Sequence, residues 1–176
     1  MSILKVARMG HPVLRAKARS LEKSEIKSAV IQKLIEDMID TMTEYHGVGL
    51  AAPQVHEGVR IFVAALDSGD DEDESELIAV INPEITVVGA DAVEDWEGCL
   101  SIPDIRGRVL RARAIKVRAL DRAGARIELS AHDFPARVIQ HEADHLDGVL
   151  FFDRMKSLGS LTFLDEYARY WRKTDD

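Results

Sequence analysis

A His-Glu-Ala-Asp-His run that begins at His141 is the part of the sequence with the clearest potential for chemistry. In an α-helix, positions i and i+4 lie on one face about one turn apart, so the imidazoles of His141 and His145 can reach one metal ion. Glu142 lies on the same side, where it can act on a water molecule without being a ligand. Two solvent-exposed histidines that bind no metal could produce the same sequence motif, so the metal-binding interpretation needs structural support. Val138 and Ile139 provide it, because they give this helix an apolar side that packs against a core.

A catalytic metal site needs a third protein ligand, and the residue types leave two candidates. Phe151 stands where metzincin peptidases have a third histidine, and phenylalanine cannot bind a metal. Glu166 follows His145 by 21 positions, a spacing that suits a gluzincin-like peptidase. Cys99 is the only cysteine, and its thiolate suits a divalent transition metal. A lone cysteine is also often a small buried apolar residue, so these residues alone leave the third ligand open.

The elements that would position these residues do not alternate regularly along the chain. Apolar residues at three- and four-residue spacing predict a helix over 24–45, with Ser24 as its N-cap and Gly47 just past its end. Pro135 is expected to open the helix that carries the HExxH motif, and Gly148 to end it. A last amphipathic helix is expected over 158–171. Strands are predicted over residues 60–66, 77–81, 84–88, 107–110, 115–120 and 126–129.

This order of elements favours an α+β fold with mainly antiparallel sheets. The sheets are expected to pack around a central metal-binding helix, the HExxH helix, with a further helix at the C-terminus. A length of 176 residues suits one domain, so residues 1–176 are expected to form a single catalytic domain.

Composition and charge exclude several classes of protein. Hydrophobic residues make up 46% of the chain and charged residues 31%, and no apolar run approaches the roughly 18 residues of a membrane span. The first residues do not resemble a secretory signal, so a cytoplasmic location without membrane attachment is expected. The net charge of -8 is concentrated in residues 67–76, which hold seven acids. The basic run over 106–126 alternates with apolar residues, which indicates a solvated strand face rather than specific nucleic-acid readout.

Two further sequence motifs, considered together with the HExxH region, form a set of three. Residues 47–54 read GVGLAAPQ, residues 97–101 read EGCLS, and residues 140–148 read QHEADHLDG. Together and in this order they resemble the three signature motifs of peptide deformylases. The resemblance implies a metal-dependent hydrolase that removes the N-formyl group from the N-terminal methionine of newly synthesised polypeptides and releases formate. It also implies that Cys99, His141 and His145 bind the metal, with Fe²⁺ expected and Zn²⁺, Ni²⁺ or Co²⁺ able to replace it.

The resemblance assigns roles to other residues of these motifs. Glu142 is expected to act as general base and then as general acid. The side-chain amide of Gln54 and the backbone N–H of Leu100 are expected to stabilise the developing oxyanion. Substrate-binding residues are expected at Gly47, Gly49, Glu97 and Val138, with an extended substrate pairing as a strand at Gly49. An ion pair between Glu97 and Arg111 is expected to brace the cysteine loop.

The implied partners are N-formylmethionyl nascent peptides, which the chain would meet as a monomer. A transient, salt-dependent contact with the ribosome is a further hypothesis, based on the basic run and on Arg169, Arg172 and Lys173 near the C-terminus. Two alternatives remain beside the deformylase. One is a gluzincin-like peptidase that uses Glu166, and the other is a non-catalytic metal-binding relative. Gln54 and Glu142 argue against the second, because metal binding alone needs neither.

Overall fold

A computed structural model describes residues 2–67 and 75–172 of the chain. Most of the acidic stretch at 67–76, and Lys173, lie outside the described residues. The helices are α1 (Lys23–Ile26), α2 (Ala29–Glu44), α3 (Asp133–Leu146), α4 (Phe151–Arg154) and α5 (Leu164–Tyr170), and short 3-10 helices span Pro12–Arg15, Ala52–Val55 and Leu158–Ser160. The strands are β1 (Gly49–Ala51), β2 (Ile61–Asp67), β3 (Ser75–Val87), β4 (Ala92–Cys99), β5 (Ile102–Ala112), β6 (Ala114–Leu120), β7 (Arg126–His132) and β8 (Thr162–Phe163).

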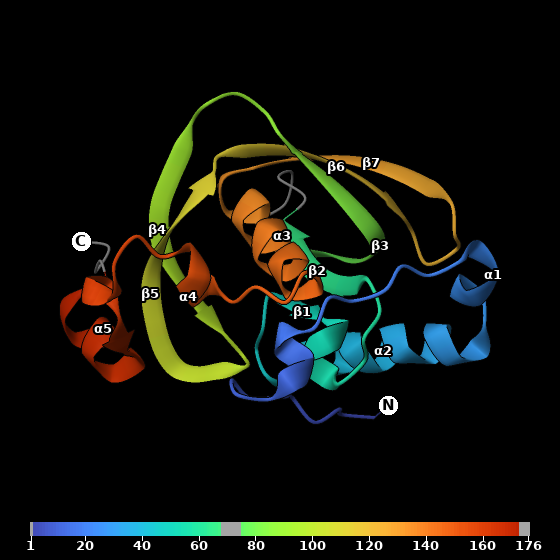
Figure 1. Cartoon of the computed structure of the whole chain (residues 1–176), viewed down its shortest axis with the longest axis horizontal. Coiled ribbons are helices and arrows are strands. Elements are labelled where there is room, and N and C mark those ends of the chain that lie inside the picture. The colour runs from blue at the N-terminus through green and yellow to red at the C-terminus, as the bar shows by residue number, and fades with distance from the viewer. Residues whose placement is uncertain (1, 68–74, 173–176) are drawn as a thin grey trace.

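The strands form two antiparallel sheets around helix α3, which confirms the predicted α+β fold. One sheet has the order β1-β2-β3-β6-β7, and the other has the order β4-β5-β8. Figure 1 shows α3 between the two sheets, with α2 beyond the five-stranded sheet and α5 at the outer side of β4 and β5. Among the described helices, none is long and apolar enough to cross a lipid bilayer.

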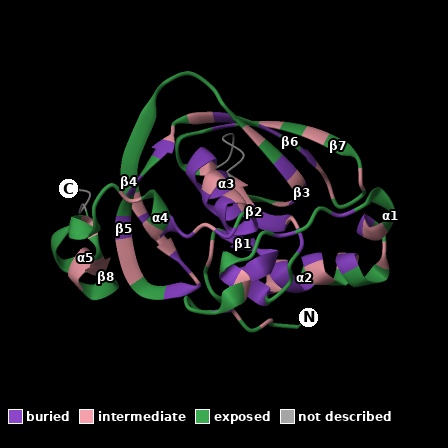
Figure 2. Ribbon diagram, viewed as in Figure 1, coloured by how far each residue is buried: buried purple, intermediate pink, exposed green. Residues whose placement is uncertain are grey.

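Strand β2 of the five-stranded sheet is buried on both faces, which is why it reads as a nearly continuous apolar run. Alternate side chains of a strand point to opposite faces. Phe62 and Ala64 therefore join the core beneath α3. Ile61 and Val63 join the core beneath α2. Figure 2 shows the resulting buried centre, with most of α3 and the inner face of α2 in purple.

A third, smaller apolar cluster packs the end of β4 against α4 and β5. Cys99 packs there with Leu14, Val109, Leu150 and Phe151, all of which are buried. The cysteine is therefore held in a core formed by β4, β5, α4 and the N-terminal segment. This packing joins a strand end to a helix that lies about fifty residues later in the chain.

The helix predicted over 24–45 is interrupted, and its cap was wrongly predicted. Ser28, and not Ser24, is the N-cap of α2: its backbone is extended, and its side chain accepts a hydrogen bond from the Ile31 N–H at 3.3 Å. A local cap of this kind competes with helical continuation. At the other end, His46 and not Gly47 takes the left-handed position, with φ 52°. The N–H groups of His46 and Gly47 then satisfy the last helical carbonyls.

The strands near the site are longer than predicted. The segments predicted over 77–81 and 84–88 are one strand, β3, with a bulge between Ile81 and Glu84. At the bulge Asn82 has φ 51°, and its side chain exchanges two hydrogen bonds with the Leu21 backbone. Strand β4 was missed altogether, because its first four residues are exposed and three of its eight residues are acidic, so it gives no apolar strand pattern. It exists because it pairs along its length with β5.

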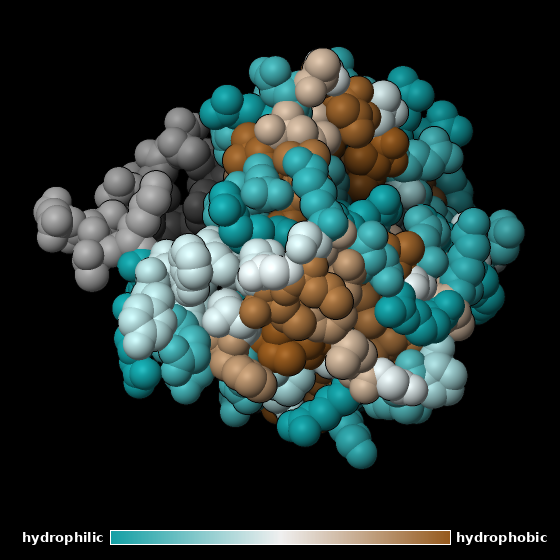
Figure 3. Space-filling view, turned by 60° about the vertical axis from the view of Figure 1, so that its left-hand side comes forward, coloured by the Kyte–Doolittle hydropathy of each residue, from teal (hydrophilic) through white to brown (hydrophobic). Residues whose placement is uncertain are grey.

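The C-terminal helix is shorter than the predicted 158–171 and covers only Leu164–Tyr170. Thr162 and Phe163 pair with Arg106 and Ile105 of β5, and this pairing takes their backbone out of the helix. Several large side chains here remain exposed, including Leu158, Phe163 and Trp171. With the β4 and β5 side of the molecule turned forward, the surface shows brown apolar patches between teal polar residues (Figure 3).

Candidate metal centre and active site

The three predicted metal ligands come from two elements that the fold brings together. His141 and His145 lie on α3 one turn apart, and their ring centroids are 5.0 Å from each other. Cys99 is the last residue of β4. Its Sγ atom lies 3.3 Å from Nε2 of His145. One ligand atom from each of the three residues falls within 4.8 Å of the other two, and all three residues are buried.

The donor set fits a divalent transition metal. One thiolate and two imidazoles in a closed group match the ligand types of Zn²⁺ and its first-row neighbours. Burial alone would raise the pKa of the Cys99 thiol, but interactions with His145 and His141 outweigh it and hold this pKa well below its ordinary value. Cys99 is therefore suited to binding a metal as the thiolate. Nδ1 of His145 and Oε2 of Glu142 are buried side-chain atoms without a hydrogen-bond partner in the described part of the protein.

Glu142 lies beside the ligands in a tight site. Burial raises the pKa of Glu142 to about 7, although the charges of His141 and His145 act in the opposite direction. A carboxyl group with a pKa near 7 is well suited to take up and release a proton at neutral pH. Gly49 of β1 packs against this carboxyl group so closely that a Cβ atom at position 49 would overlap it. The glycine is thus needed for the close approach of β1 to α3.

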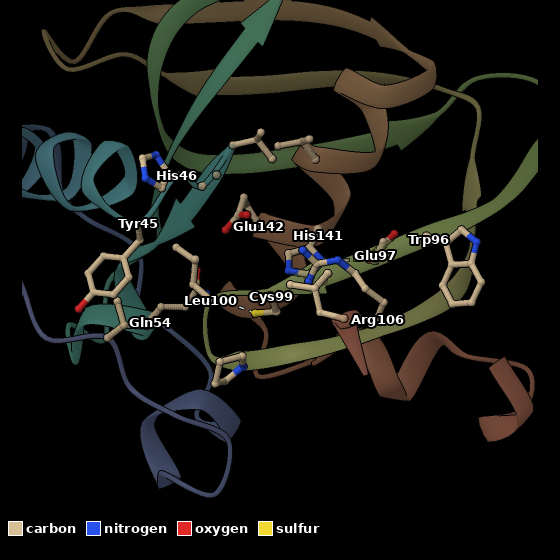
Figure 4. Close-up of a pocket in the computed structure, with 18 of the residues that line it drawn as sticks. Tyr45, His46, Gln54, Trp96, Glu97, Cys99, Leu100, Arg106, His141 and Glu142 are labelled. Atoms are coloured by element: carbon tan, nitrogen blue, oxygen red, sulfur yellow. Dashed lines mark hydrogen bonds and ion pairs between the residues drawn. The ribbon is translucent and has the colours of Figure 1, made fainter. Parts of the chain in front are cut away.

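Gln54 and Leu100 both lie next to the cysteine. Gln54 lies in the 3-10 helix that follows β1, and its Nε2 is 3.4 Å from Cys99 Sγ. Leu100 directly follows Cys99, in the turn between β4 and β5. Figure 4 shows Glu142 and His141 from α3 above Cys99 in the view, with Leu100 and Gln54 to its left. Potential hydrogen-bond donors therefore lie next to the candidate metal centre.

Glu97 holds His141 through a buried charge network. Its Oε2 accepts a hydrogen bond from Nδ1 of His141 at 2.9 Å, which leaves Nε2 of that ring for the metal. The expected ion pair with Arg111 is present, with two N–H···O contacts of 2.9 Å. Burial would raise the pKa of Glu97, but the hydrogen bonds from Arg111 and His141 dominate and hold it well below its usual range. The Glu97 carboxylate is thus engaged within the protein.

Arg137 is a second cation in this network, and the sequence reasoning missed it. Its Nη1 donates to Glu97 Oε1 at 2.7 Å and to the Val109 carbonyl at 2.9 Å, and its Nη2 donates to the Val93 carbonyl at 2.7 Å. The side chain therefore ties α3 to both β4 and β5. A signal for it was available, because Arg137 precedes His141 by four residues and shares its helix face.

We expect Arg137→Met to lower the free energy of unfolding by about 3 kcal/mol, since breaking a buried charge pair typically costs ~3–5 kcal/mol. The loss should fall at the lower end of this range, because Glu97 keeps Arg111 as a partner. Urea unfolding of the purified protein measures the effect. Arg118→Met is the matched control: Arg118 pairs with Glu128, but both side chains are more than three-quarters exposed. That control should cost less than about 1 kcal/mol, and equal losses in the two variants would contradict the buried role of Arg137.

A pocket of about 570 Å³ opens above the candidate metal centre. Nine of the ten predicted site residues line it, and His145 lies just beneath them, where its Nε2 faces Cys99. The lining residues from the prediction are Gly47, Gly49, Gln54, Glu97, Cys99, Leu100, Val138, His141 and Glu142. Residues at the pocket that were not predicted include Tyr45, His46, Arg106 and Leu164. Tyr45 and His46 follow α2, Arg106 lies on β5 and Leu164 begins α5, so their positions at the pocket depend on tertiary packing.

Two further charged residues have partners within the protein. Glu166, the alternative third ligand, lies on α5, where it pairs with Arg169 at 3.2 Å, and it is not part of the Cys99, His141 and His145 group. Asp144 lies on α3 between the two histidines and is buried. It accepts hydrogen bonds from Arg111 and Arg154, which stabilise its charge in the interior.

Comparisons with known proteins agree with this geometry. Residues 3–160 match the family model described as "Polypeptide deformylase". The chain is 44% identical to peptide deformylase 2 of a Nostoc species over 168 residues, which is 94% of this chain and 93% of the relative. It is also similar to the Met-Ala-Ser-bound crystal structure of a class I type b peptide deformylase from Acinetobacter baumannii. The TM-score is 0.82 at 39% identity, over 88% of this chain and all of the other. The peptide deformylase of Thermotoga maritima gives 0.80 at 40% identity, over 89% of this chain and all of that one.

Proposed function

The chain belongs to the polypeptide deformylase family, and from this premise we propose which residues carry out the reaction. Family membership makes the chain a hydrolase that removes the N-formyl group from nascent polypeptides. The proposal for the residues rests chiefly on one observation. A thiolate and two imidazoles converge within 4.8 Å beneath a pocket, with a buried carboxyl group of raised pKa beside them.

Cys99, His141 and His145 would hold one divalent metal ion. When bound, such an ion lowers the pKa of water and polarises a carbonyl group. Glu97 keeps His141 in the tautomer whose Nε2 faces the cysteine, because it accepts the hydrogen on Nδ1. Glu97 is therefore assigned to positioning the ligand rather than to contacting substrate.

Glu142 would move the protons of the reaction. Its carboxylate takes a proton from the attacking water, so that the oxygen bonds to the formyl carbon. It then gives the proton to the amide nitrogen as the C–N bond breaks, which yields formate and a free amino group. Negative charge develops on the formyl oxygen between these steps. The Gln54 amide and the Leu100 N–H are suited to stabilise it, because they are fixed donors next to the metal centre.

Strand β1 would bind the peptide backbone. It is the edge strand of the five-stranded sheet, and Gly49 lies in the pocket wall. An extended peptide can add to such an edge through backbone hydrogen bonds. Gly47 and Val138 also line the pocket, where they would contact the methionine end of the substrate. The peptide in the Acinetobacter baumannii structure, Met-Ala-Ser, has the form of a deformylated product.

Release of formate from formyl-Met-Ala tests the proposed reaction directly. We expect stoichiometric formate and free Met-Ala, and no cleavage of unformylated Met-Ala-Ser. Cleavage of the unformylated peptide without formate release would instead indicate a peptidase.

We propose Fe²⁺ as the resident metal, with Zn²⁺, Ni²⁺ or Co²⁺ able to replace it. Elemental analysis of protein purified without oxygen should find about one iron per chain. Iron beside a thiolate reacts with oxygen more easily than nickel does, and Cys99 itself can be oxidised. The iron form should therefore lose activity in air faster than the nickel form. Equal decay of the two forms would contradict iron as the source of oxygen sensitivity.

We further propose that residues 1–176 act as one catalytic domain, as a monomer in the cytoplasm, and that the chain contacts ribosomes transiently. The support for the ribosome contact is the exposed Arg172 and the exposed Lys116 of β6. Arg169 is less available, because it pairs with Glu166. Co-sedimentation with empty ribosomes should occur at low salt and fall steeply as salt rises. No co-sedimentation at low salt would contradict the contact.

A further inference from the structure

The side-chain amide of Gln54 is held by contacts from two segments of the chain. Its Oε1 accepts a hydrogen bond from the Ala51 N–H at 2.8 Å. Because a backbone N–H can only donate, this contact identifies the oxygen of the amide and so fixes which end is Nε2. Nε2 then faces two acceptors, Cys99 Sγ at 3.4 Å and Ser101 Oγ at 3.2 Å.

Ser101 is placed for this contact by the turn between β4 and β5. It is fully buried, with 0% of its surface exposed, and Gln54 is 1% exposed. The N-terminal segment forms a backbone hydrogen bond with each of the two residues. The Ala7 N–H donates to the Gln54 carbonyl at 2.7 Å, and the Met9 N–H donates to the Ser101 carbonyl at 2.8 Å. Backbone and side-chain contacts therefore hold Ser101 and Gln54 in one fixed arrangement.

We propose that Ser101 is a positioning residue that aims the Gln54 amide at the reacting oxygen. An amide nitrogen has two hydrogens in one plane. When Ser101 Oγ accepts one of them, the other is directed to the side of Cys99, where the metal centre and the formyl oxygen would lie. This inference rests on the proposed function of Gln54 as an oxyanion donor. Preorganised donors are effective because they need no reorientation during the reaction.

Ser101→Ala should lower kcat about tenfold, which is less than the ~10²–10³-fold cost of removing such a donor completely. KM for formyl-Met-Ala and the metal content should stay unchanged, because Ser101 does not line the pocket and is not among the ligands. Thr41→Val is the matched control. Thr41 is also a fully buried hydroxyl with two hydrogen-bond partners, the Leu4 N–H and the Asp37 carbonyl, but it lies on α2. That control should lower stability and leave kcat within about twofold.

A double-mutant cycle with Gln54→Ala separates this inference from the proposed function. If Ser101 acts through Gln54, then Ser101→Ala should lower kcat no further once Gln54 is alanine. Full activity of Gln54→Ala would overturn the proposed role of Gln54 itself. A large loss in Gln54→Ala with no kcat loss in Ser101→Ala would overturn only the positioning role, and so would additive losses or loss of metal.

Proton exchange of the Gln54 side-chain amide provides a test on the unmodified protein, should Ser101→Ala not fold. The amide signals are identified by their disappearance in Gln54→Ala. We expect at least one of the two hydrogens to be protected from exchange with water, as a hydrogen bond to a buried hydroxyl requires. Exchange of both hydrogens as fast as in an exposed glutamine would overturn the positioning role.

Discussion

Cys99→Ala is expected to yield a protein that retains almost no metal and no measurable deformylase activity. Cys99 supplies the only sulfur among the three converging ligand atoms, and a catalytic site with three protein ligands has none to spare. Residues that merely support a ligand typically contribute ~10–100-fold to metal affinity, so losing a ligand should weaken binding by more than about 100-fold. His145→Ala should behave in the same way. Elemental analysis and formate release from formyl-Met-Ala measure the two losses.

The matched control for the histidine is His132→Ala. His132 is exposed at the beginning of the same helix and is not part of the ligand group, so metal and activity should persist. Metal binding by Cys99 can also be tested by thiol modification, because Cys99 is the only thiol in the chain. A thiol reagent should modify the metal-free protein faster than the metal-loaded one. A metal-replete and fully active Cys99→Ala protein would contradict the ligand set.

The sequence predicted the part of the site that depends on local geometry. The four-residue spacing of His141 and His145 determines their common helix face, and the structure places them accordingly. The third metal ligand could not be predicted in this way. Both a cysteine and a glutamate can bind a metal, so Cys99 and Glu166 were both candidates. The choice between them depends on packing of β4 against α3, which no local spacing encodes. Resemblance to a family of proteins supplied that information, and the structure places Cys99 with the histidines and Glu166 elsewhere.

The support around the ligands was harder to predict than the ligands themselves. Arg137 and Asp144 have residue types that are usually solvated, and both are buried here because their charges meet partners from distant strands. Similarly, the break before α2 depends on whether Ser24 or Ser28 caps the helix, and both residues satisfy the same sequence rule. Only the packing of α1 and α2 against the sheet decides between them. Long-range contacts thus decide which charged residues are buried and which serine caps the helix, and the sequence pattern alone does not distinguish these possibilities.

Glu142→Gln is expected to keep the metal and to lower kcat/KM by about 10²–10⁴-fold, the usual contribution of general acid–base catalysis. Glutamine has nearly the same shape, so it fits against Gly49 in the same close packing, but it cannot take up and return a proton. The metal should remain because Cys99, His141 and His145 are unchanged. Elemental analysis together with formate release separates this outcome from that of Cys99→Ala, in which metal and activity disappear together.

Stability provides the control for Glu142→Gln, and its sign follows from the pKa. Burial raises the pKa of Glu142 from its ordinary value of 4.5 to about 7, so the metal-free folded protein loses stability as the pH rises from 4.5 to about 7, and the full cost is present at pH 8. A neutral glutamine avoids this cost, and the free energy of unfolding of metal-free Glu142→Gln at pH 8 should therefore be no lower than that of the unmodified protein. With folding and metal intact, the lost turnover can be assigned to the proton transfer alone. Activity within about threefold of the original, far short of the range for acid–base catalysis, would show that another group moves the proton.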